Sequence, residues 1–263
     1  MSDRLPGATW PGGVRLLVHD EVTSTNEVAM ALAAQGDAGE LWVRAGRQSA
    51  GKGRSGRIWQ SVAGNLFASH LFRVPAPLMV APQIPLLAGV AVIDAVRDVS
   101  AGRDLAELQL KWPNDILVAN AKLGGILVES MAEPGGRGFA AVVGIGLNVV
   151  GRPELAAGGA TSLKEHGIAA SAETMLTLIA RRLQEWRGHW RLGQGFATVR
   201  QAWLERGMAR GVALSVNAGE TRLSGRFAGL AEDGSLLLDE GRGEPRRVTY
   251  GDVSLGMGAD PAT

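Results

Sequence analysis

Cysteine is absent from the 263 residues of the chain, and neither sign of charge is in excess. Without cysteine there are no disulfides, thiolate metal sites or cysteine nucleophiles, and the composition fits a reducing cytoplasm. Because the net charge is only +1, nothing global indicates a nucleic-acid or anionic membrane partner, and any electrostatic specialisation must be local. The N-terminus has no apolar h-region, so we expect no signal peptide and a cytoplasmic location.

Long uninterrupted hydrophobic runs are also lacking. The most apolar window, Leu78 to Val96, is broken by Pro82, Pro85 and Asp94, which predicts a buried helix after a proline-rich approach and no membrane span. The four histidines are isolated in the sequence, so we expect no metal site made of protein ligands alone. A hydrophobic content of 46% is enough for one large core with a small additional module.

Hydrophobic periodicity indicates an α+β fold, a mixed β-sheet with helices, followed by a separate β-module. Ser24 to Glu27 resembles a capping box, in which Ser24 would cap a helix running through Ala33. Strands are predicted over 15–22, 41–43, 66–72, 107–112, 115–119, 123–129 and 140–149, helices over 87–99, 175–190 and 196–205, and a tight turn at Asn120–Ala121. From residue 211, short β-type runs alternate with turn residues. We therefore predict a catalytic domain over 1–209 and an SH3-like β-barrel over 210–258.

The stretch from Leu41 to Ile93 contains no acidic residue, yet it carries Arg44, Arg47, Lys52, Arg54, Arg57 and Arg73. This pattern predicts a local positive field with no internal carboxylate to neutralise it. Glycines 46, 51, 53 and 56 would let the backbone approach a ligand and present amide N–H groups to an anion. We interpret Gly46 to Trp59 as an anion-binding active-site loop, with a mobile, solvated surface loop as the alternative.

Two common nucleotide motifs almost match this loop. Gly46 to Lys52 reads G-x-x-x-x-G-K, but Gly53 stands where a P-loop needs Ser or Thr, and Gly51 to Gly56 reads G-x-G-x-x-G. Both motifs require a helix to begin at once, so that its N-terminus meets the phosphates. Here the following residues end in a turn signal at Gly64–Asn65 and then a strand. Both motifs are therefore rejected on their context.

A third interpretation uses the whole loop and three distant segments. Residues 48–59 (QSAGKGRSGRIW) resemble the GRGRxGRxW signature of the biotin–protein ligases. In the order of that family follow the matches Ser24-Thr25-Asn26, Lys111 to Asp115 (KWPND) with Lys122 to Glu129 (KLGGILVE), and Gly144 to Asn148 (GIGLN). The likeness covers nearly the whole chain, including a C-terminal barrel. Lys52 stands where the family usually has arginine, which keeps the charge but loses bidentate geometry.

The resemblance implies a biotin/lipoate ligase-like catalytic domain that makes biotinyl-5′-AMP from biotin and ATP. It then implies transfer of biotin to a lysine of a biotin carboxyl carrier protein, with Mg2+ neutralising the polyphosphate. Alternatives are a lipoate or octanoate ligase of the same fold, and a non-catalytic biotin-binding protein. Some family members carry an N-terminal DNA-binding domain, and we expect none here because few residues precede the first strand. A homodimer is compatible with the sequence, which has no interface stripe that would settle it.

The resemblance also assigns roles to individual residues. It makes Lys122, Arg54 and Asp115 catalytic, with Lys122 on the biotin carboxylate and the α-phosphate. Biotin would be bound by Ser24, Thr25, Asn26, Gln48, Lys52, Gly53, Arg54, Lys122 and Gly125, and ATP or the adenylate by Arg57, Trp59, Asn114 and Asn148. Without the motifs, Ser24 also fits a helix cap, Trp59 a core position, Asp115 a turn and Lys122 a solvated lysine. We further expect the loop to order over the adenylate and to exclude water from it.

Overall fold

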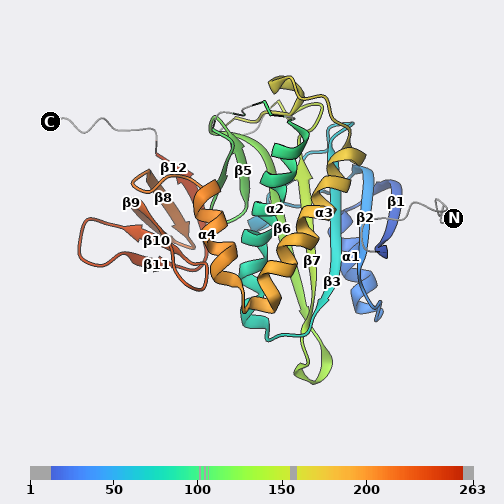
Figure 1. Ribbon diagram of the computed structural model, residues 1–263, viewed down its shortest axis with the longest axis horizontal. Helices are drawn as coiled ribbons and strands as arrows, with labels where there is room; N and C mark the ends of the chain where they lie inside the picture. Colours follow the sequence, from blue (N-terminus) through green and yellow to red (C-terminus); the bar gives the residue numbers. More distant parts are fainter. Residues whose placement is uncertain (1–12, 101, 104, 106, 155–158, 257–263) are drawn as a thin grey trace.

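The computed structural model describes residues 13–100, 102–103, 105, 107–154 and 159–256. Its larger part is built around a mixed seven-stranded sheet with the order β1-β2-β3-β7-β6-β5-β4 (Figure 1). The strands are β1 (Arg15–Val22), β2 (Leu41–Gln48), β3 (Leu66–Val74), β4 (Gln109–Lys111), β5 (Asp115–Val118), β6 (Ala121–Ala132) and β7 (Phe139–Leu147). β1 is parallel to β2, and the other neighbours are antiparallel.

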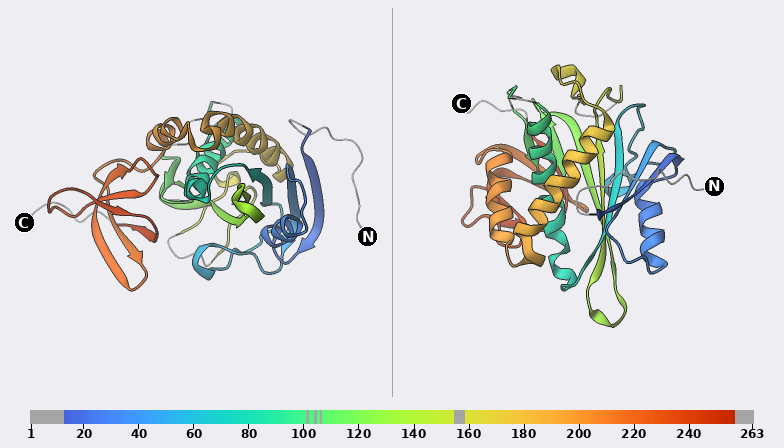
Figure 2. Two further views of the ribbon diagram at one scale, coloured as in Figure 1. Left: turned by 90° about the horizontal axis from the view of Figure 1, so that it is seen from below. Right: turned by 45° about the vertical axis from the view of Figure 1, so that its right-hand side comes forward.

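Helices cover the two faces of this sheet unequally, as the left view of Figure 2 shows. The helices α2 (Ile84–Val99) and α3 (Ala172–Trp190) lie on one face, and α1 (Thr25–Ala34) lies on the other. Because side chains alternate along a strand, β2 sends Trp42 to the first face and Val43 to the second. The short α1 leaves part of its face uncovered, and the functional residues lie there.

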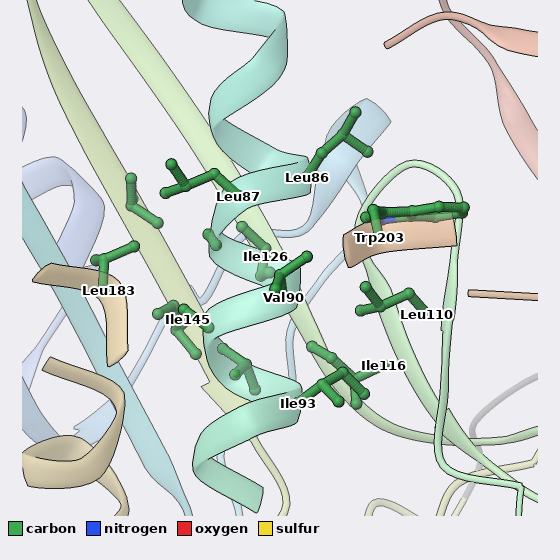
Figure 3. Packing of buried hydrophobic residues seen from close by; sticks show 14 of the residues in the cluster. Leu86, Leu87, Val90, Ile93, Leu110, Ile116, Ile126, Ile145, Leu183 and Trp203 are labelled. Carbon is green, nitrogen blue, oxygen red and sulfur yellow. The ribbon is translucent and has the colours of Figure 1, made fainter. Parts of the chain in front are cut away.

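The helix α2 is the centre of the larger hydrophobic cluster (Figure 3). Its buried residues, among them Leu87 and Val90, pack against Ile126 and Ile145 of the sheet and against Leu183 of α3. The segment Leu78–Val99 is, by length and composition, apolar enough to cross a membrane, with a mean hydropathy of 1.8. In the fold, α2 buries most of this apolar surface in the core, whereas Leu78 and Met79 are exposed.

The C-terminal strands form the predicted SH3-like module, a five-stranded antiparallel sheet with the order β11-β10-β9-β8-β12. Its strands are β8 (Ala213–Ala218), β9 (Thr221–Leu230), β10 (Leu236–Asp239), β11 (Arg246–Val248) and β12 (Asp252–Leu255). The helix α4 (Phe196–Arg206) leads into it, and Trp203 packs edge-on against Phe227 with ring centroids 6.1 Å apart. Trp112 Nε1 donates to Gly234 O at 3.1 Å, so the module is fixed to the first sheet.

The α+β fold class is confirmed, but several local predictions were wrong. Ser24 precedes α1 in an extended conformation, yet its side chain makes no capping hydrogen bond, and Glu27 pairs with Thr23 and Lys52 instead of reaching back. The β5–β6 turn lies at Ala119–Asn120, one residue earlier than predicted, since Val118 pairs with Ala121 and both turn residues have positive φ. The expectation that no DNA-binding domain precedes the first strand concerns residues that are mostly outside the described part.

Candidate active site

A cavity of about 380 Å³ opens on the sheet face that α1 leaves uncovered. It is lined by residues from α1, the loop after β2, β5, β6 and β7, which lie between Ser24 and Ala160 in the sequence. The predicted site residues all line it: Ser24, Thr25, Asn26, Gln48, Lys52, Gly53, Arg54, Arg57, Trp59, Asn114, Asp115, Lys122, Gly125 and Asn148. The fold therefore brings the four matched segments to one place, which the sequence order alone does not require.

The floor of the cavity is made of glycines on β6 and β7. Gly125 pairs with Gly146 across the two strands, and Gly144 lies two residues before Gly146 on the same face. A Cβ at Gly146 would lie 2.6 Å from Trp59 Cζ2, and one at Gly144 would lie 2.9 Å from Asn26 Cγ. The glycines of the GGI and GIG segments are needed because two site side chains lie directly on the sheet.

One end of the cavity is a hydrogen-bond network of buried amides and hydroxyls that also reaches the carboxylate of Glu129. Thr25 and Asn26 are each 3% exposed, and Asn26 Nδ2 donates to Leu127 O at 3.2 Å and to Glu129 Oε2 at 2.7 Å. Gln48 Oε1 accepts from Thr25 N at 2.8 Å, and Ser69 Oγ donates to Asn26 Oδ1 at 2.6 Å. Such a fixed set of amides and hydroxyls suits the polar head of an uncharged ligand.

The other end of the cavity carries cations held by one carboxylate. Asp115 Oδ1 lies 2.6 Å from Lys122 Nζ, and Asp115 Oδ2 lies 2.8 Å from Lys111 Nζ. Burial alone would raise the pKa of the Asp115 carboxyl, but the two ammonium groups outweigh it and hold that pKa below its usual value. Asp115 therefore stays ionised and fixes Lys122, whose Nζ lies 5.5 Å from the centroid of the Trp59 ring.

The predicted loop forms a short hairpin with its own internal contacts. Trp59 N donates to Gly51 O at 2.8 Å, and Gly53 N donates to Arg57 O at 2.7 Å. A Cβ at Gly51 would collide with Trp59 O. The glycines at 51 and 53 thus allow the two limbs of the loop to approach each other. The expectation that the Gly53 amide faces an anion is wrong for this arrangement.

The sequence suggested that no carboxylate neutralises the positive field of residues 41–93, but the fold brings carboxylates to it. Each basic residue of that stretch meets an acidic residue from elsewhere: Arg44 meets Glu173, Arg47 meets Glu21, Lys52 meets Glu27, Arg54 and Arg57 meet Asp252, and Arg73 meets Glu133. Arg54 keeps the most distant of these partners, at 3.8 Å, and its guanidinium donates to neutral acceptors, Asn114 Oδ1 and Gly251 O. Of these six cations, Arg54 is thus the one best placed to meet a phosphate.

The β-module contributes directly to this end of the cavity. Arg57 Nη2 lies 2.6 Å from Asp252 Oδ1, Arg54 Nη2 donates to Gly251 O at 3.2 Å, and Lys111 Nζ donates to Val253 O at 3.1 Å. Gly251 and the first two residues of β12 therefore hold three cations, of which Arg54 and Arg57 line the cavity. No sequence motif singled out this segment, because it lies almost 200 positions from the loop.

The structure shows what the predicted residue Asn148 contacts. It also adds Asn65, Glu27 and Ser69, which contact site residues but were not predicted from the sequence. Asn148 is buried, and its Nδ2 donates to Lys122 O at 3.3 Å and to Thr161 O at 3.0 Å. Asn65, first interpreted as a turn residue, is 3% exposed and donates to Asn148 Oδ1 at 3.1 Å.

Among the described residues, no group of three or more His, Asp or Glu side chains forms a metal site.

Comparisons with known proteins agree with this geometry. A model described as the Biotin/lipoate A/B protein ligase family matches residues 20–148, and one described as the Biotin protein ligase C terminal domain matches residues 210–256. The chain is similar to the biotin–[acetyl-CoA-carboxylase] ligase of Paracoccus denitrificans, with 38% identity over 222 residues, 82% of this chain and 90% of the relative. The corresponding ligase of Mycobacterium tuberculosis is 38% identical over 195 residues, 71% of this chain and 70% of the relative.

A solved structure carries the likeness into three dimensions. The biotin protein ligase from Aquifex aeolicus, in complex with biotin and ATP, superimposes with a TM-score of 0.75 at 28% identity. The match covers 92% of this chain and 98% of that chain, so it includes both the seven-stranded sheet and the C-terminal module. The motifs, the cavity and these matches together show that the chain belongs to the biotin protein ligases of the biotin/lipoate A/B protein ligase family.

Proposed function

We propose that the chain is an ATP-dependent ligase that joins biotin to a specific lysine of a biotin carboxyl carrier protein. A biotin carboxylate oxygen would attack the α-phosphorus of ATP and release pyrophosphate, forming biotinyl-5′-AMP. The neutral amine of the acceptor lysine would then attack the acyl carbon, AMP would leave, and the amine would lose its proton. Negative charge develops on the phosphate in the first step and on the acyl oxygen in the second.

The observation that carries the proposal is that one cavity joins a network of amide and hydroxyl side chains to a set of fixed cations. The network of Thr25, Asn26 and Gln48 suits a cyclic urea, which offers one carbonyl acceptor and two N–H donors. Lys122 and Arg54 also line the cavity, and we infer that a carboxylate and a phosphate meet beside them. A lipoyl or octanoyl chain has no polar head that could hydrogen-bond to this network. This mismatch favours biotin over the acids that related ligases could use.

The residues would divide the chemistry between them. Lys122, oriented by Asp115, would hold the biotin carboxylate beside the α-phosphate, and Arg54 would stabilise the charge that develops there. Arg57 would hold the loop or the pyrophosphate, and Lys52, Gly53, Gly125 and Ser24 would border biotin. Trp59, Asn114 and Asn148 would border the adenylate. Mg2+, when bound to the polyphosphate, would neutralise part of its charge.

The closing of the loop is part of the same proposal. Its two limbs cover the cavity from α1 to the β-module, so a closed loop would keep water from the mixed anhydride. We place the division between the catalytic domain and the β-module near residue 209, before β8. We also propose that the protein is cytoplasmic and that it forms a homodimer. Sedimentation tests whether it is a dimer.

Biotin-dependent exchange of pyrophosphate into ATP tests this function. The expected result is exchange with biotin, no exchange with lipoate or octanoate, and transfer of biotin to an apo carrier protein. Exchange with lipoate but not with biotin would overturn the proposed substrate. Binding of biotin without any exchange or transfer would identify a binding protein, and the ligase proposal would fail.

A further inference from the structure

Asn65 is buried beneath the cavity and makes five hydrogen bonds. Its Oδ1 accepts from the backbone N–H groups of Val149 at 2.9 Å, Val150 at 3.0 Å and Gly151 at 3.2 Å. Its Nδ2 donates to Gly151 O at 2.8 Å and to Asn148 Oδ1 at 3.1 Å. No family motif named above includes Asn65, and it does not line the cavity itself.

These partners fix which end of each amide is the oxygen. Backbone N–H groups can only donate and the Gly151 carbonyl can only accept, so the Asn65 amide has one allowed orientation. Asn65 must then present a donor to Asn148, which answers with its oxygen. The Lys122 and Thr161 carbonyls require the nitrogen of Asn148 on their side, in agreement. The chemistry of the neighbours thus assigns both amides without ambiguity.

Toward the cavity, Asn148 can still accept a hydrogen bond but cannot donate one. Both N–H bonds of its Nδ2 are used by carbonyls, while its Oδ1 accepts a single hydrogen bond among the described residues. An amide oxygen can accept two, so Asn148, which lines the cavity, offers one more acceptor and no donor. At Asn148 the cavity can therefore recognise a ligand group that donates a hydrogen bond.

We propose that Asn65 is a positioning residue that sets the nucleobase specificity of the site by orienting Asn148. The inference rests on the proposed use of ATP and deepens it. Adenine carries an exocyclic amino group, which donates, where hypoxanthine and guanine carry an oxygen, which accepts. With Asn148 Oδ1 held as an acceptor, the amino group of adenine donates a hydrogen bond to it. The oxygen of hypoxanthine or guanine would instead face Asn148 Oδ1, and the two oxygens would repel each other. A buried site built for one hydrogen bond rejects an analogue that cannot make it.

The substitution Asn65→Asp isolates this effect. The new carboxylate still accepts from the three backbone N–H groups, but it offers no donor to Asn148 Oδ1. Turning the Asn148 amide over would give the carboxylate a donor and present an N–H group to the cavity, but it would set Asn148 Oδ1 against the Lys122 and Thr161 carbonyls. Asn148 would therefore no longer be held in one orientation. We expect the KM for ATP to rise at least tenfold, the preference for ATP over ITP to fall at least tenfold, and the KM for biotin to change less than twofold. Asn65→Ala, which removes the donor without burying a charge, should act in the same direction.

Asn26→Asp is the matched control, because Asn26 is an equally buried amide at the biotin end, 3% exposed like Asn65. It should raise the KM for biotin and leave the ratio of ATP to ITP unchanged. The inference is overturned if the ATP-to-ITP preference of both Asn65 variants stays within twofold of the parent, or if their KM values for biotin and ATP rise equally with that preference unchanged. A parent without biotin-dependent exchange would instead refute the proposed function. Calorimetric affinities for ATP and ITP would then still decide the role of Asn65.

Discussion

The glycine floor allows two similar substitutions to damage opposite ends of the cavity. Gly144 and Gly146 lie on the same strand and face, and neither has a positive φ, so alanine is acceptable to the backbone at both. The added Cβ would lie 2.9 Å from Asn26 Cγ at position 144 and 2.6 Å from Trp59 Cζ2 at position 146. The whole effect must therefore come from the side chain that is pushed away.

The distances set the size of the effect. Carbon atoms pack at about 3.5 to 4.0 Å, so each displaced side chain must retreat by roughly 1 Å. Asn26 cannot turn freely, since it is hydrogen-bonded to Leu127 O, Glu129 and Ser69. Forcing an extra carbon into such packing costs about 1 to 3 kcal/mol, which corresponds to roughly a 5- to 150-fold loss of binding or rate.

We expect Gly144→Ala to raise the Kd for biotin by that factor and to leave the affinity for ATP within about threefold. Gly146→Ala should instead lower kcat/KM for ATP in the exchange assay, because Trp59 and the loop attached to it are displaced. Titration calorimetry with biotin and exchange kinetics over a range of ATP measure the two effects. If both variants weaken biotin equally, the two ends of the cavity are not separate and the reasoning is wrong.

Three further predictions concern single charged groups. Lys122→Ala should slow adenylate formation by about 10²- to 10³-fold with biotin still bound, as for other removed charge-stabilising groups, and a normal rate would refute its role. Asp252→Asn should increase the release of free biotinyl-adenylate several-fold, whereas Glu240→Gln, which breaks a similarly exposed ion pair at 2.8 Å within the β-module, should not; equal release from both would exclude a specific role for the loop contact. Burial opposes a low pKa for Glu40, but the neighbouring histidine and arginine outweigh it and lower that pKa from 4.5 to about 2. Because the pKa is lower in the folded chain, Glu40 stabilises the fold above about pH 4.5 and loses this effect toward pH 2. Glu40→Gln should therefore lower the Tm at pH 7, with the difference from the parent disappearing near pH 2; a difference that persists there would contradict the linkage.

The sequence by itself determined the elements and the family. Period-3.6 and period-2 patterns, together with glycine and proline positions, predicted most helices and strands, and four ordered segments carried the resemblance to biotin ligases. Those segments work because each is local: the loop contains its own glycines and cations, and Lys122 and Gly125 lie on one strand. The residues of such a segment can be recognised in the sequence without knowing the path of the chain in the fold.

Only the tertiary structure decided which groups those residues meet. The sequence suggested cations without carboxylates, but ion pairs formed with distant residues, such as Asp252, which lies 195 positions from Arg57. The sequence also suggested that Gly51 makes room for a ligand and that Asn65 marks a turn, whereas Gly51 makes room for Trp59 and Asn65 orients Asn148. A glycine or an amide has the same letter in either role. Which role it plays depends on the atoms that packing brings within about 3 Å, and those come from distant parts of the chain.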